Sequence, residues 1–384
     1  MIRNILAEKN LDYVELFADE DMLKPLGDDY VVICFSSSNE YSPVLSVAVK
    51  SLIDNTDYKY KYDIVILNED ITESNKSLIY SIVNRDNCTL RFVNIRKLIA
   101  DRHFFTWAHF TSFTYYRLLI PDIFAQYTKV LYLDSDIVVK HDVSELFFEN
   151  IDDYIIAGAM DTHVASRMSD DNSYAKEEGD YFLNELQLKE GEYVQAGVLL
   201  FNVKEFHKKY KKGELIDIAS NRKYRWLDQD LLNVECRGDI KILSNKWNVM
   251  VLNTPSRIDE VHLRSDFYEE YIHARRNPYI VHYIGRSIPC FKPSIDMYYY
   301  WWQYARLTPY YELLIHLMVS ESEKRSLKKI ENVKDELVAY YDRSRLLVKT
   351  KRHLIDPTIS FILPKGTKRR EFVRSCWWKI IGHE

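Results

Sequence analysis

Two aspartates that could do chemistry together, Asp134 and Asp136, stand one residue apart directly after an apolar run. Side chains at i and i+2 of an extended chain point to the same side. At the C-terminal end of a parallel strand, they would face the crevice in which open α/β sheets bind ligands. Two carboxylates there repel each other unless a cation lies between them, and Mg²⁺ or Mn²⁺ bridging to a diphosphate would satisfy both charges. The alternative is a plain turn after a strand, where Asp-Ser-Asp is common.

The element that would present these aspartates is a buried strand over residues 130–133. Continuous apolar runs of this length are typical of strands that are buried on both faces of a parallel sheet. Similar runs predict strands at 30–35, 62–67, 90–95, 154–160, 198–202 and 279–283. Amphipathic segments predict helices at 43–54, 72–83, 114–127, 203–210 and 228–236. Because strands and helices alternate, we expect βαβ units and a twisted, mostly parallel sheet flanked by helices.

Start signals support two of these helices. Ser42 is the expected N-cap of the helix over 43–54, and Pro43 suits its first position. Asp228 could cap the helix over 228–236. Pro121 is expected to break or restart the helix over 114–127.

Composition narrows the class of protein. Hydrophobic residues make up 47% and charged residues 28% of the 384, which is typical of a soluble globular protein and excludes wholesale disorder. The five cysteines are odd in number and far apart, so we expect neither a disulfide framework nor a thiolate zinc site, and a reducing cytoplasmic compartment fits. Residues 1–17 lack the apolar segment of a signal peptide, and no apolar run approaches the roughly 18 residues of a membrane span.

Several blocks together carry a resemblance to a known family. They are Tyr116-Arg117-Leu118-Leu119-Ile120-Pro121, then the segment 129–139 with Asp134-Ser135-Asp136, then Gln195-Ala196-Gly197-Val198-Leu199-Leu200-Phe201-Asn202, Asp228-Gln229-Asp230-Leu231-Leu232-Asn233 and His282-Tyr283-Ile284-Gly285. In this order they resemble glycosyltransferase family 8, which includes bacterial lipopolysaccharide galactosyl- and glucosyltransferases and glycogenin. The resemblance covers roughly residues 30 to 300, and the blocks are specific only as a set.

The resemblance implies a GT-A fold and transfer of a hexose from a UDP-sugar with retention of anomeric configuration. It implies a Mn²⁺ ion, with Mg²⁺ as the alternative, held by Asp134, Asp136 and His282. It places Asp161 against the donor sugar and Asp228 and Gln229 at the reacting carbon. The residues implied to bind the donor are Ser38, Asn39, Arg117, Asp134, Ser135, Gln195, Ala196, Gly197, Gly285 and Arg286. Without the resemblance, His282 would be read as a hydrogen-bonded structural histidine and Arg117 as part of a surface ion pair.

The sequence departs from the family pattern at three places. Ser38 stands where the family has an aspartate that binds uracil, although Ser38 or Asn39 could still bond the base. Gln195 replaces the asparagine of the family's N-A-G block. Ile288, Pro289 and Cys290 stand where the family often has a lysine for the diphosphate and then Pro-Trp, so Arg286 or Lys292 would have to supply that charge.

Charge and composition divide the chain into three parts: a helical extension over residues 1–28, a catalytic domain over 29–300 and a helical, basic-aromatic region over 301–384. The segment 343–384 holds 11 Lys or Arg and 3 Asp or Glu, a net charge of +8, which leaves −5 − 8 = −13 for the rest. Basic residues interleaved with aromatics predict an interfacial helix on an anionic membrane surface, peripheral on the inner face of the cytoplasmic membrane. The alternative is a solvated helix that packs its aromatics on the body. The acidic body argues against nucleic acid as a partner.

Three functions remain to be distinguished. The first is a Mn²⁺-dependent retaining hexosyltransferase that builds a cell-surface glycan, in lipopolysaccharide or capsule, on a lipid-linked saccharide acceptor. The second is a binding or scaffold protein that has the fold but little or no turnover, which Ser38 and Ile288 would favour. The third, a nucleotidyltransferase, would need a Gly-rich basic loop after the first strand, and Ser36 to Glu40 contains neither Gly nor Lys.

Overall fold

The computed structural model describes residues 13–15, 22–99, 112–169, 173–251, 262–285 and 287–325, together with 368 and 371. The chain divides into two compact units, Met1–Val319 and Ser320–Glu384. The first unit holds the sheets and the candidate site. Most of the second unit, including the predicted basic tail except for Lys368 and Glu371, lies outside the described residues.

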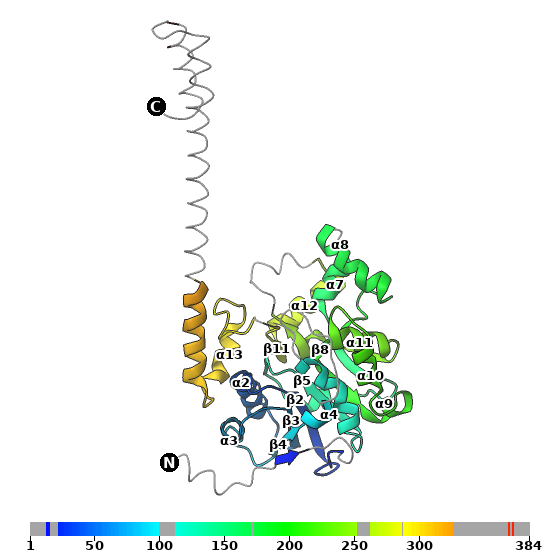
Figure 1. Ribbon diagram of the computed structural model, residues 1–384, viewed down its shortest axis with the longest axis vertical. Helices are drawn as coiled ribbons and strands as arrows, with labels where there is room; N and C mark the ends of the chain where they lie inside the picture. Colours follow the sequence, from blue (N-terminus) through cyan, green and yellow to red (C-terminus); the bar gives the residue numbers. More distant parts are fainter. Residues whose placement is uncertain are drawn as a thin grey trace. The chain divides into compact units, whose positions relative to one another are not determined.

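The core of the first unit is a mixed sheet with strand order β1-β4-β3-β2-β5-β8-β7-β9 (Figure 1). Pairing is parallel from β1 through β5, antiparallel on both sides of β8, and parallel again between β7 and β9. The strands are β1 Tyr13–Glu15, β2 Tyr30–Ser36, β3 Lys61–Asn68, β4 Cys88–Asn94, β5 Lys129–Leu133, β7 Ile156–Met160, β8 Val194–Asn202 and β9 Ile240–Leu243. The predicted mostly parallel sheet flanked by helices is confirmed.

Helices lie on both faces of this sheet, as Figure 1 shows for α2 and α3 on one side and α9 to α11 on the other. The α-helices are α2 Ser42–Asp54, α3 Glu73–Tyr80, α4 Arg96–Ile99, α5 Ile120–Ile123, α6 Ser144–Phe147, α7 Thr162–Ser169, α8 Ser173–Asp180, α9 Val203–Lys209, α10 Glu214–Asn221, α11 Leu227–Glu235, α12 Ser265–Arg276 and α13 Tyr298–Ala305. Two 3₁₀ segments are η1 Ser112–Leu119 and η3 Asn245–Asn248, and η2 Tyr181–Glu185 is a π-helical segment. Residues 311–319 are also helical and belong to the first unit.

A second, small sheet brings the late part of the chain to the edge that carries the aspartates. Its strand order is β10-β11-β6, with β6 Ile137–Val139, β10 Val249–Met250 and β11 Ile280–His282. His282 pairs with Ile137 across the antiparallel β11–β6 ladder and with Met250 across the parallel β10–β11 ladder. Because β6 begins one residue after Asp136, this pairing places His282 beside the second aspartate.

β8 brings the middle blocks of the sequence to the same edge. All nine of its residues are buried, as expected for a central strand between β5 and β7. Its antiparallel register pairs Val198 with Leu133, and the backbone N–H of Asp134 donates to the carbonyl oxygen of Gly197 at 2.8 Å. The segment from Gln195 to Gly197 therefore lies directly across from Asp134.

The structure corrects several local predictions. Within the described part of 1–28, residues 13–15 form strand β1 and residues 22–28 are not helical, so a helical extension is wrong there. Tyr41, not Ser42, is the N-cap residue of α2, and its side chain makes no capping bond. The helix predicted over 114–127 is the 3₁₀ turn η1 followed by the short α5, with Pro121 in the first turn of α5.

At the other end, the first unit continues past the boundary predicted near residue 300. Helix α13 packs against α2 and β6. The side chain of Asn55, which follows α2, donates to the hydroxyl oxygen of Tyr304 at 2.9 Å. Residues 301–319 are therefore part of the same compact unit as the sheet.

Candidate metal and donor site

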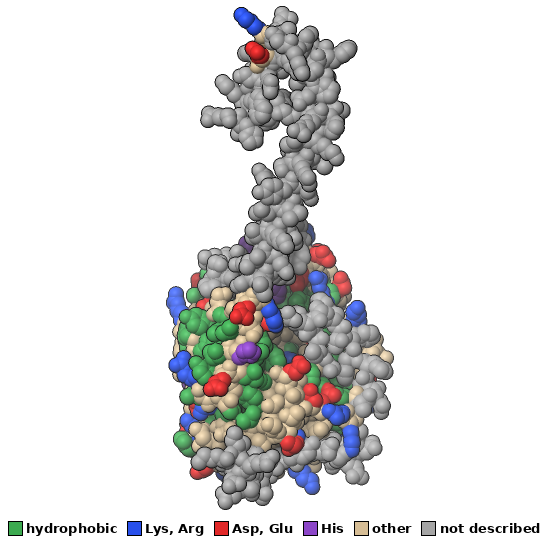
Figure 2. Space-filling model, turned by 60° about the vertical axis from the view of Figure 1, so that its left-hand side comes forward, with side chains coloured by type: hydrophobic (Ala, Val, Ile, Leu, Met, Phe, Trp, Pro, Cys, Tyr) green, Lys and Arg blue, Asp and Glu red, His purple; other side chains and the backbone are tan. Residues whose placement is uncertain are grey.

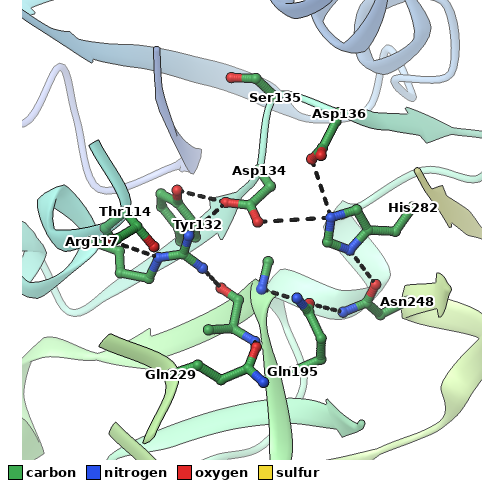
Figure 3. Close-up of polar contacts among 12 residues, drawn as sticks. Thr114, Arg117, Tyr132, Asp134, Ser135, Asp136, Gln195, Gln229, Asn248 and His282 are labelled. Atoms are coloured by element: carbon green, nitrogen blue, oxygen red, sulfur yellow. Dashed lines mark hydrogen bonds and ion pairs between the residues drawn. The ribbon is translucent and has the colours of Figure 1, made fainter. Parts of the chain in front are cut away.

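Asp134, Asp136 and His282 form a compact cluster at the C-terminal edge of β5 (Figure 3). The Nε2 atom of His282 lies 3.1 Å from Oδ1 of Asp136 and 3.7 Å from Oδ2 of Asp134. Ligand atoms of all three residues lie within 4.8 Å of one another. The three residues predicted from the sequence are thus brought together.

The chemistry of this donor set fits a divalent cation. Two carboxylates and an imidazole nitrogen converge, and an imidazole beside carboxylates suits Mn²⁺ better than the harder Mg²⁺. Burial lowers the pKa of His282, but the charge and hydrogen bond of Asp136 together with the charge of Asp134 outweigh it, so the pKa is raised above the ordinary histidine value. The carboxylates that attract a proton to this ring would attract a metal ion in the same way.

Gly197 makes room for this cluster. A Cβ atom at this position would lie 2.3 Å from Cε1 of His282 and 2.6 Å from Oδ2 of Asp134, far inside van der Waals contact. Both atoms belong to groups that are held in place by neighbours, so neither could move away cheaply. The glycine of the Gln195-Ala196-Gly197 block is therefore needed for space at the metal cluster.

Arg117, which η1 presents, connects the metal cluster to the buried carboxylate of Asp228. Figure 3 shows its contact with Asp134. Its Nη2 atom donates to Oδ1 of Asp134 at 3.0 Å, and its Nε atom lies 2.9 Å from Oδ2 of Asp228. Its Nη1 atom donates to the carbonyl oxygen of Ala196. The guanidinium also lies over the ring of Tyr132, 4.7 Å from the ring centre. The predicted donor-binding arginine is therefore a buried hub between two aspartates, not part of a surface ion pair.

Asp228 lies on the first turn of α11 with its carboxylate buried beside Arg117. Burial raises the pKa of Asp228 to about 6, although Arg117 and a hydrogen bond from Thr114 lower it and Asp134 raises it. The N-cap residue of α11 is Trp226, so the prediction that Asp228 caps this helix is wrong. Its carboxylate faces the site instead.

Gln229 and Asp161 are joined by a hydrogen bond. The Nε2 atom of Gln229 donates to Oδ2 of Asp161 at 3.0 Å, and its Oε1 atom accepts from the backbone N–H of Ala196, also at 3.0 Å. The other oxygen of Asp161 accepts from the backbone N–H groups of His163 and Val164 at the start of α7, each at 3.0 Å. Gln229 is therefore held at both ends of its amide, half-buried at the edge of the site.

The residues predicted to bind the base and the diphosphate do not form a compact cluster as the three predicted metal ligands do. Oδ1 of Asn39 accepts from the backbone N–H of Thr72 at 3.0 Å and from Nδ2 of Asn75 at 2.7 Å, so this oxygen is already bonded to the start of α3. The hydroxyl of Ser38 accepts from the backbone N–H of Tyr41 at 3.3 Å. Ser135 donates its hydroxyl to the carbonyl oxygen of Ser36 at 2.8 Å, which ties the Asp134–Asp136 turn to the end of β2.

The segment after His282 bends at Gly285, where φ is +62°, a left-handed conformation that favours glycine. Arg286 lies outside the described residues. Ile288 and Cys290 are fully buried, so the positions at which the family often has a lysine and then Pro-Trp are part of the core here.

Sequence reasoning did not identify Asn248 and Tyr132. Oδ1 of Asn248 lies 2.9 Å from Nδ1 of His282, and the hydroxyl of Tyr132 donates to Oδ1 of Asp134 at 2.8 Å. A signal for Tyr132 was available, because a hydroxyl at the end of an otherwise aliphatic buried strand needs a polar partner. Asn248 gave no such signal, since its position depends on how the small sheet pairs.

Comparisons with known proteins show the family and confirm the predicted GT-A fold class. The family model described as Glycosyl transferase family 8 matches residues 32–292. A putative glycosyltransferase of Haemophilus influenzae is 28% identical over 222 residues, which are 56% of this chain and 62% of that protein. A lipopolysaccharide 1,2-glucosyltransferase of Escherichia coli is 30% identical over 185 residues, 46% of this chain and 48% of that protein.

Solved structures show the same fold. The apo structure of the bifunctional glycosyltransferase WbbM is similar with a TM-score of 0.68 and 28% identity, over 77% of this chain and 53% of that one. The galactosyltransferase LgtC is similar with a TM-score of 0.55 and 21% identity, over 72% of this chain and 96% of that one. The chain spans less than two thirds of the Haemophilus protein and about half of WbbM.

Proposed function

This chain belongs to glycosyltransferase family 8, and from that premise we propose that it transfers glucose or galactose from a UDP-sugar to a saccharide or lipid-linked saccharide acceptor, with retention of anomeric configuration. The observation that carries the proposal is the continuity of the site. The metal cluster of Asp134, Asp136 and His282 is linked through Arg117 to Asp228, and Ala196 links Arg117 to Gln229. A metal-bound diphosphate and the sugar attached to it would meet these groups in that order.

Asp134, Asp136 and His282 are the residues that would hold Mn²⁺, or Mg²⁺ in its place. When bound, the cation would neutralise the diphosphate leaving group as the glycosidic bond breaks. Arg117 orients Asp134 for this task by the 3.0 Å bond to its Oδ1 atom, which leaves Oδ2 directed toward His282. Gly197 keeps the space between these groups open.

Gln229, Asp228 and Asp161 are the residues proposed to face the donor sugar. An amide is a poor nucleophile, so a covalent glycosyl intermediate on Gln229 is less plausible than a front-face reaction through an oxocarbenium-like state. The acceptor hydroxyl then attacks on the side of the departing diphosphate, and a leaving phosphate oxygen takes its proton. The paired carboxylates of retaining glycosidases are not required in such a scheme. The carboxylates of Asp161 and Asp228 would bind the hydroxyl groups of the sugar.

The choice of hexose and acceptor rests on similar proteins. The Escherichia coli relative is described as a lipopolysaccharide 1,2-glucosyltransferase. This supports a hexose donor and a cell-surface glycan as the product, without naming the sugar or the linkage. A scaffold protein with little or no turnover is the competing proposal, and turnover itself distinguishes the two.

The test is a screen of UDP-sugars for UDP release by the full chain, with and without Mn²⁺. We expect release from UDP-glucose or UDP-galactose that depends on Mn²⁺ and is lost in the Asp134→Ala/Asp136→Ala double variant. The matched control is Asp152→Ala/Asp153→Ala, an exposed acidic pair away from the cluster, which should retain activity. In a reaction with an acceptor that is converted to product, proton NMR of the product should show the α-anomer of the transferred hexose. No release from any UDP-sugar would favour the scaffold, and a β-linked product would contradict retention.

A further inference from the structure

A line of buried hydrogen bonds runs from the backbone of β8 to the ring of His282 (Figure 3). The N–H of Gly197 donates to Oε1 of Gln195 at 2.7 Å, and Nδ2 of Asn248 donates to the same oxygen at 2.7 Å. Oδ1 of Asn248 then lies 2.9 Å from Nδ1 of His282. The ring's other nitrogen, Nε2, faces Asp134 and Asp136.

The direction of every bond in this line follows from its first member. A backbone N–H can only donate, so the atom of Gln195 that faces Gly197 must be the oxygen. The group of Asn248 that faces this oxygen must then be its NH₂, which turns the Asn248 oxygen toward His282. A carbonyl oxygen only accepts, so Nδ1 of His282 must carry a proton. In the neutral ring, Nε2 is then left with its lone pair directed at the two aspartates.

We propose that Asn248 is a positioning residue that holds His282 in the tautomer able to bind a metal ion through Nε2, and that Gln195 fixes the orientation of Asn248. The inference rests on the proposed function, because it assumes that the cluster binds a cation. A histidine that binds a metal with one nitrogen usually donates its other N–H to a fixed acceptor, which sets both tautomer and ring orientation.

Packing allows few alternatives to this arrangement. Asn248, Gln195 and His282 are 3%, 7% and 1% exposed, so competing water is largely excluded. Asn248 ends η3 directly before β10, and β10 pairs with β11, which carries His282. Asn248 thus directly precedes the strand that lies beside the strand of His282. The missing Cβ of Gly197 lets the imidazole lie against β8.

These hydrogen bonds also explain one position at which the sequence departs from the family pattern. Gln195 stands where the resemblance predicts an asparagine, and its side chain is one methylene longer. With this length, Oε1 both accepts from Gly197 two residues on along β8 and reaches Asn248 on η3. In this chain, the side-chain oxygen of Gln195 is therefore bonded within the protein, behind the metal cluster.

The affinity of the full chain for Mn²⁺ alone, measured by electron paramagnetic resonance titration of the free ion, tests the proposal. Asn248→Leu keeps the side chain's size but removes the acceptor for Nδ1–H, so we expect affinity for Mn²⁺ to fall about 10- to 100-fold. The matched control is Asn68→Leu, which removes another buried asparagine, at the end of β3, whose Nδ2 atom donates to the carbonyl oxygens of Ile66 and Val93. It should bind Mn²⁺ as the wild type does. An equal loss in both variants would mean a general effect of burying leucine and would overturn the proposal.

A second measurement reads the tautomer directly, in chains labelled with ¹⁵N-histidine and free of metal, at a pH where the ring is neutral. His282 is assigned by its loss in His282→Ala. The wild type should show Nδ1 protonated. In Asn248→Leu the proton should move to Nε2, where the aspartates accept it. An Nδ1-protonated ring in both chains overturns the proposal.

Failure of this inference and failure of the proposed function are distinguishable. If the wild type and Asn248→Leu bind Mn²⁺ equally well, the role of Asn248 is overturned and the metal site stands. Wild-type chain that binds no Mn²⁺ would overturn the metal site itself, and the positioning role with it.

Discussion

Asp228 shows how a single buried charge is balanced in this site. Its carboxylate is 2% exposed and lies 2.9 Å from Nε of Arg117, an atom whose hydrogen is donated to the carbonyl oxygen of Thr114. The ion pair therefore lacks an aligned hydrogen bond, which limits how far Arg117 can offset the cost of burial. That imbalance explains why the pKa of Asp228 is raised to about 6 even beside an arginine.

The raised pKa of Asp228 predicts a pH-dependent stability. The protonated form is favoured in the folded state, so this contribution is fully present below the unfolded pKa of about 4 and is lost as pH rises through about 6. A shift of roughly 2 pKa units corresponds to about 3 kcal/mol. Asp228→Asn cannot titrate. The free energy of unfolding of the wild type, relative to this variant, should therefore fall by roughly 2 kcal/mol between pH 4 and pH 7, which is most of the full change.

Urea denaturation of both chains across this pH range measures the difference. Because every other titrating group is common to the two proteins, their contributions largely cancel. A difference that stays constant between pH 4 and pH 7 would show that Asp228 ionises as freely in the folded as in the unfolded chain.

At the level of single residues, the sequence predicted what lies at the ends of strands. Asp134, Asp136 and His282 each end or follow an apolar run, so their side chains had to reach the carboxyl edge of a sheet. Asn39 could not be placed in this way, because its oxygen is claimed by Thr72 and Asn75 from a separate element. Asn248 depended on a pairing of two-residue β10 that no periodicity reveals.

At the level of elements, the turn into α11 determines where Asp228 and Gln229 lie. Leu227, directly before them, has φ of +52°, which is costly for a residue with a γ-branched side chain. Asp230 compensates: its Oδ2 atom accepts from the backbone N–H of Trp226 at 2.7 Å and from the hydroxyl of Tyr181 at 2.6 Å. Its Oδ1 atom accepts from the hydroxyl of Tyr193 at 2.6 Å. The second aspartate of the Asp-Gln-Asp block thus holds the turn that presents the first two residues.

This network predicts energetic coupling between Asp230 and Tyr193. We expect a coupling energy of about 1 kcal/mol or more from a double-mutant cycle of Asp230→Asn and Tyr193→Phe, followed by urea denaturation. Either single substitution already breaks the hydrogen bond to the buried carboxylate, so the double variant loses no further energy from it. The matched control cycle combines Asp230→Asn with Tyr62→Phe. Tyr62 is also buried and donates to an aspartate, Asp142, but shares no partner with Asp230.

The control cycle should show coupling below about 0.5 kcal/mol. If the Asp230–Tyr193 cycle is equally small, the carboxylate does not hold the turn through this tyrosine. The urea denaturation curves of the single variants also show whether their unfolding stays cooperative.

Elements that are long and uniformly apolar were predictable, whereas short ones were not. β2, β3 and β8 are buried along nearly their whole length, and each was expected within a few residues of its bounds. The helix predicted over 114–127 failed because Arg117 and Thr114 turn inward to Asp228 and Asp134, and a 3₁₀ turn accommodates this. In the small sheet, β11 is the exception, since it was expected within 279–283. β6 and β10 have three and two residues and carry too little pattern to be recognised alone.

At the level of the whole molecule, apolar surface is found on the face of the first unit that carries α13. Figure 2 shows hydrophobic side chains gathered there among acidic, basic and polar ones. Large apolar residues that are at least 40% exposed include Tyr298, Tyr299, Leu307, Tyr311 and Leu313. In the described part of the chain, no helix is both long and apolar enough to cross a membrane. The mixed charge on this face does not by itself favour an anionic surface.

The predicted membrane contact therefore depends on the tail, which lies outside the described residues except for Lys368 and Glu371. Six basic residues stand between positions 365 and 379, and Trp377-Trp378 adjoin the last of them. Each Lys or Arg near an anionic surface contributes roughly 1 kcal/mol, and interfacial tryptophans add apolar burial at the headgroup level. The full chain should co-sediment with anionic vesicles, bind neutral ones weakly, and dissociate at high salt because the charges are screened.

Paired aromatic substitutions decide whether the tail or the α13 face makes this contact. Trp377→Ala/Trp378→Ala should release the chain from anionic vesicles, whereas Tyr298→Ala/Tyr299→Ala, which removes an exposed aromatic pair from the first unit, should not. Both variants should hydrolyse the donor as the wild type does, since neither pair belongs to the site. Transfer to a lipid-linked acceptor should fall only in the tryptophan variant, and transfer to a soluble acceptor fragment in neither. Release by the tyrosine pair alone would move the contact to the α13 face. A wild-type chain that stays in the supernatant with both kinds of vesicle would favour a tail that packs its aromatics on the protein itself.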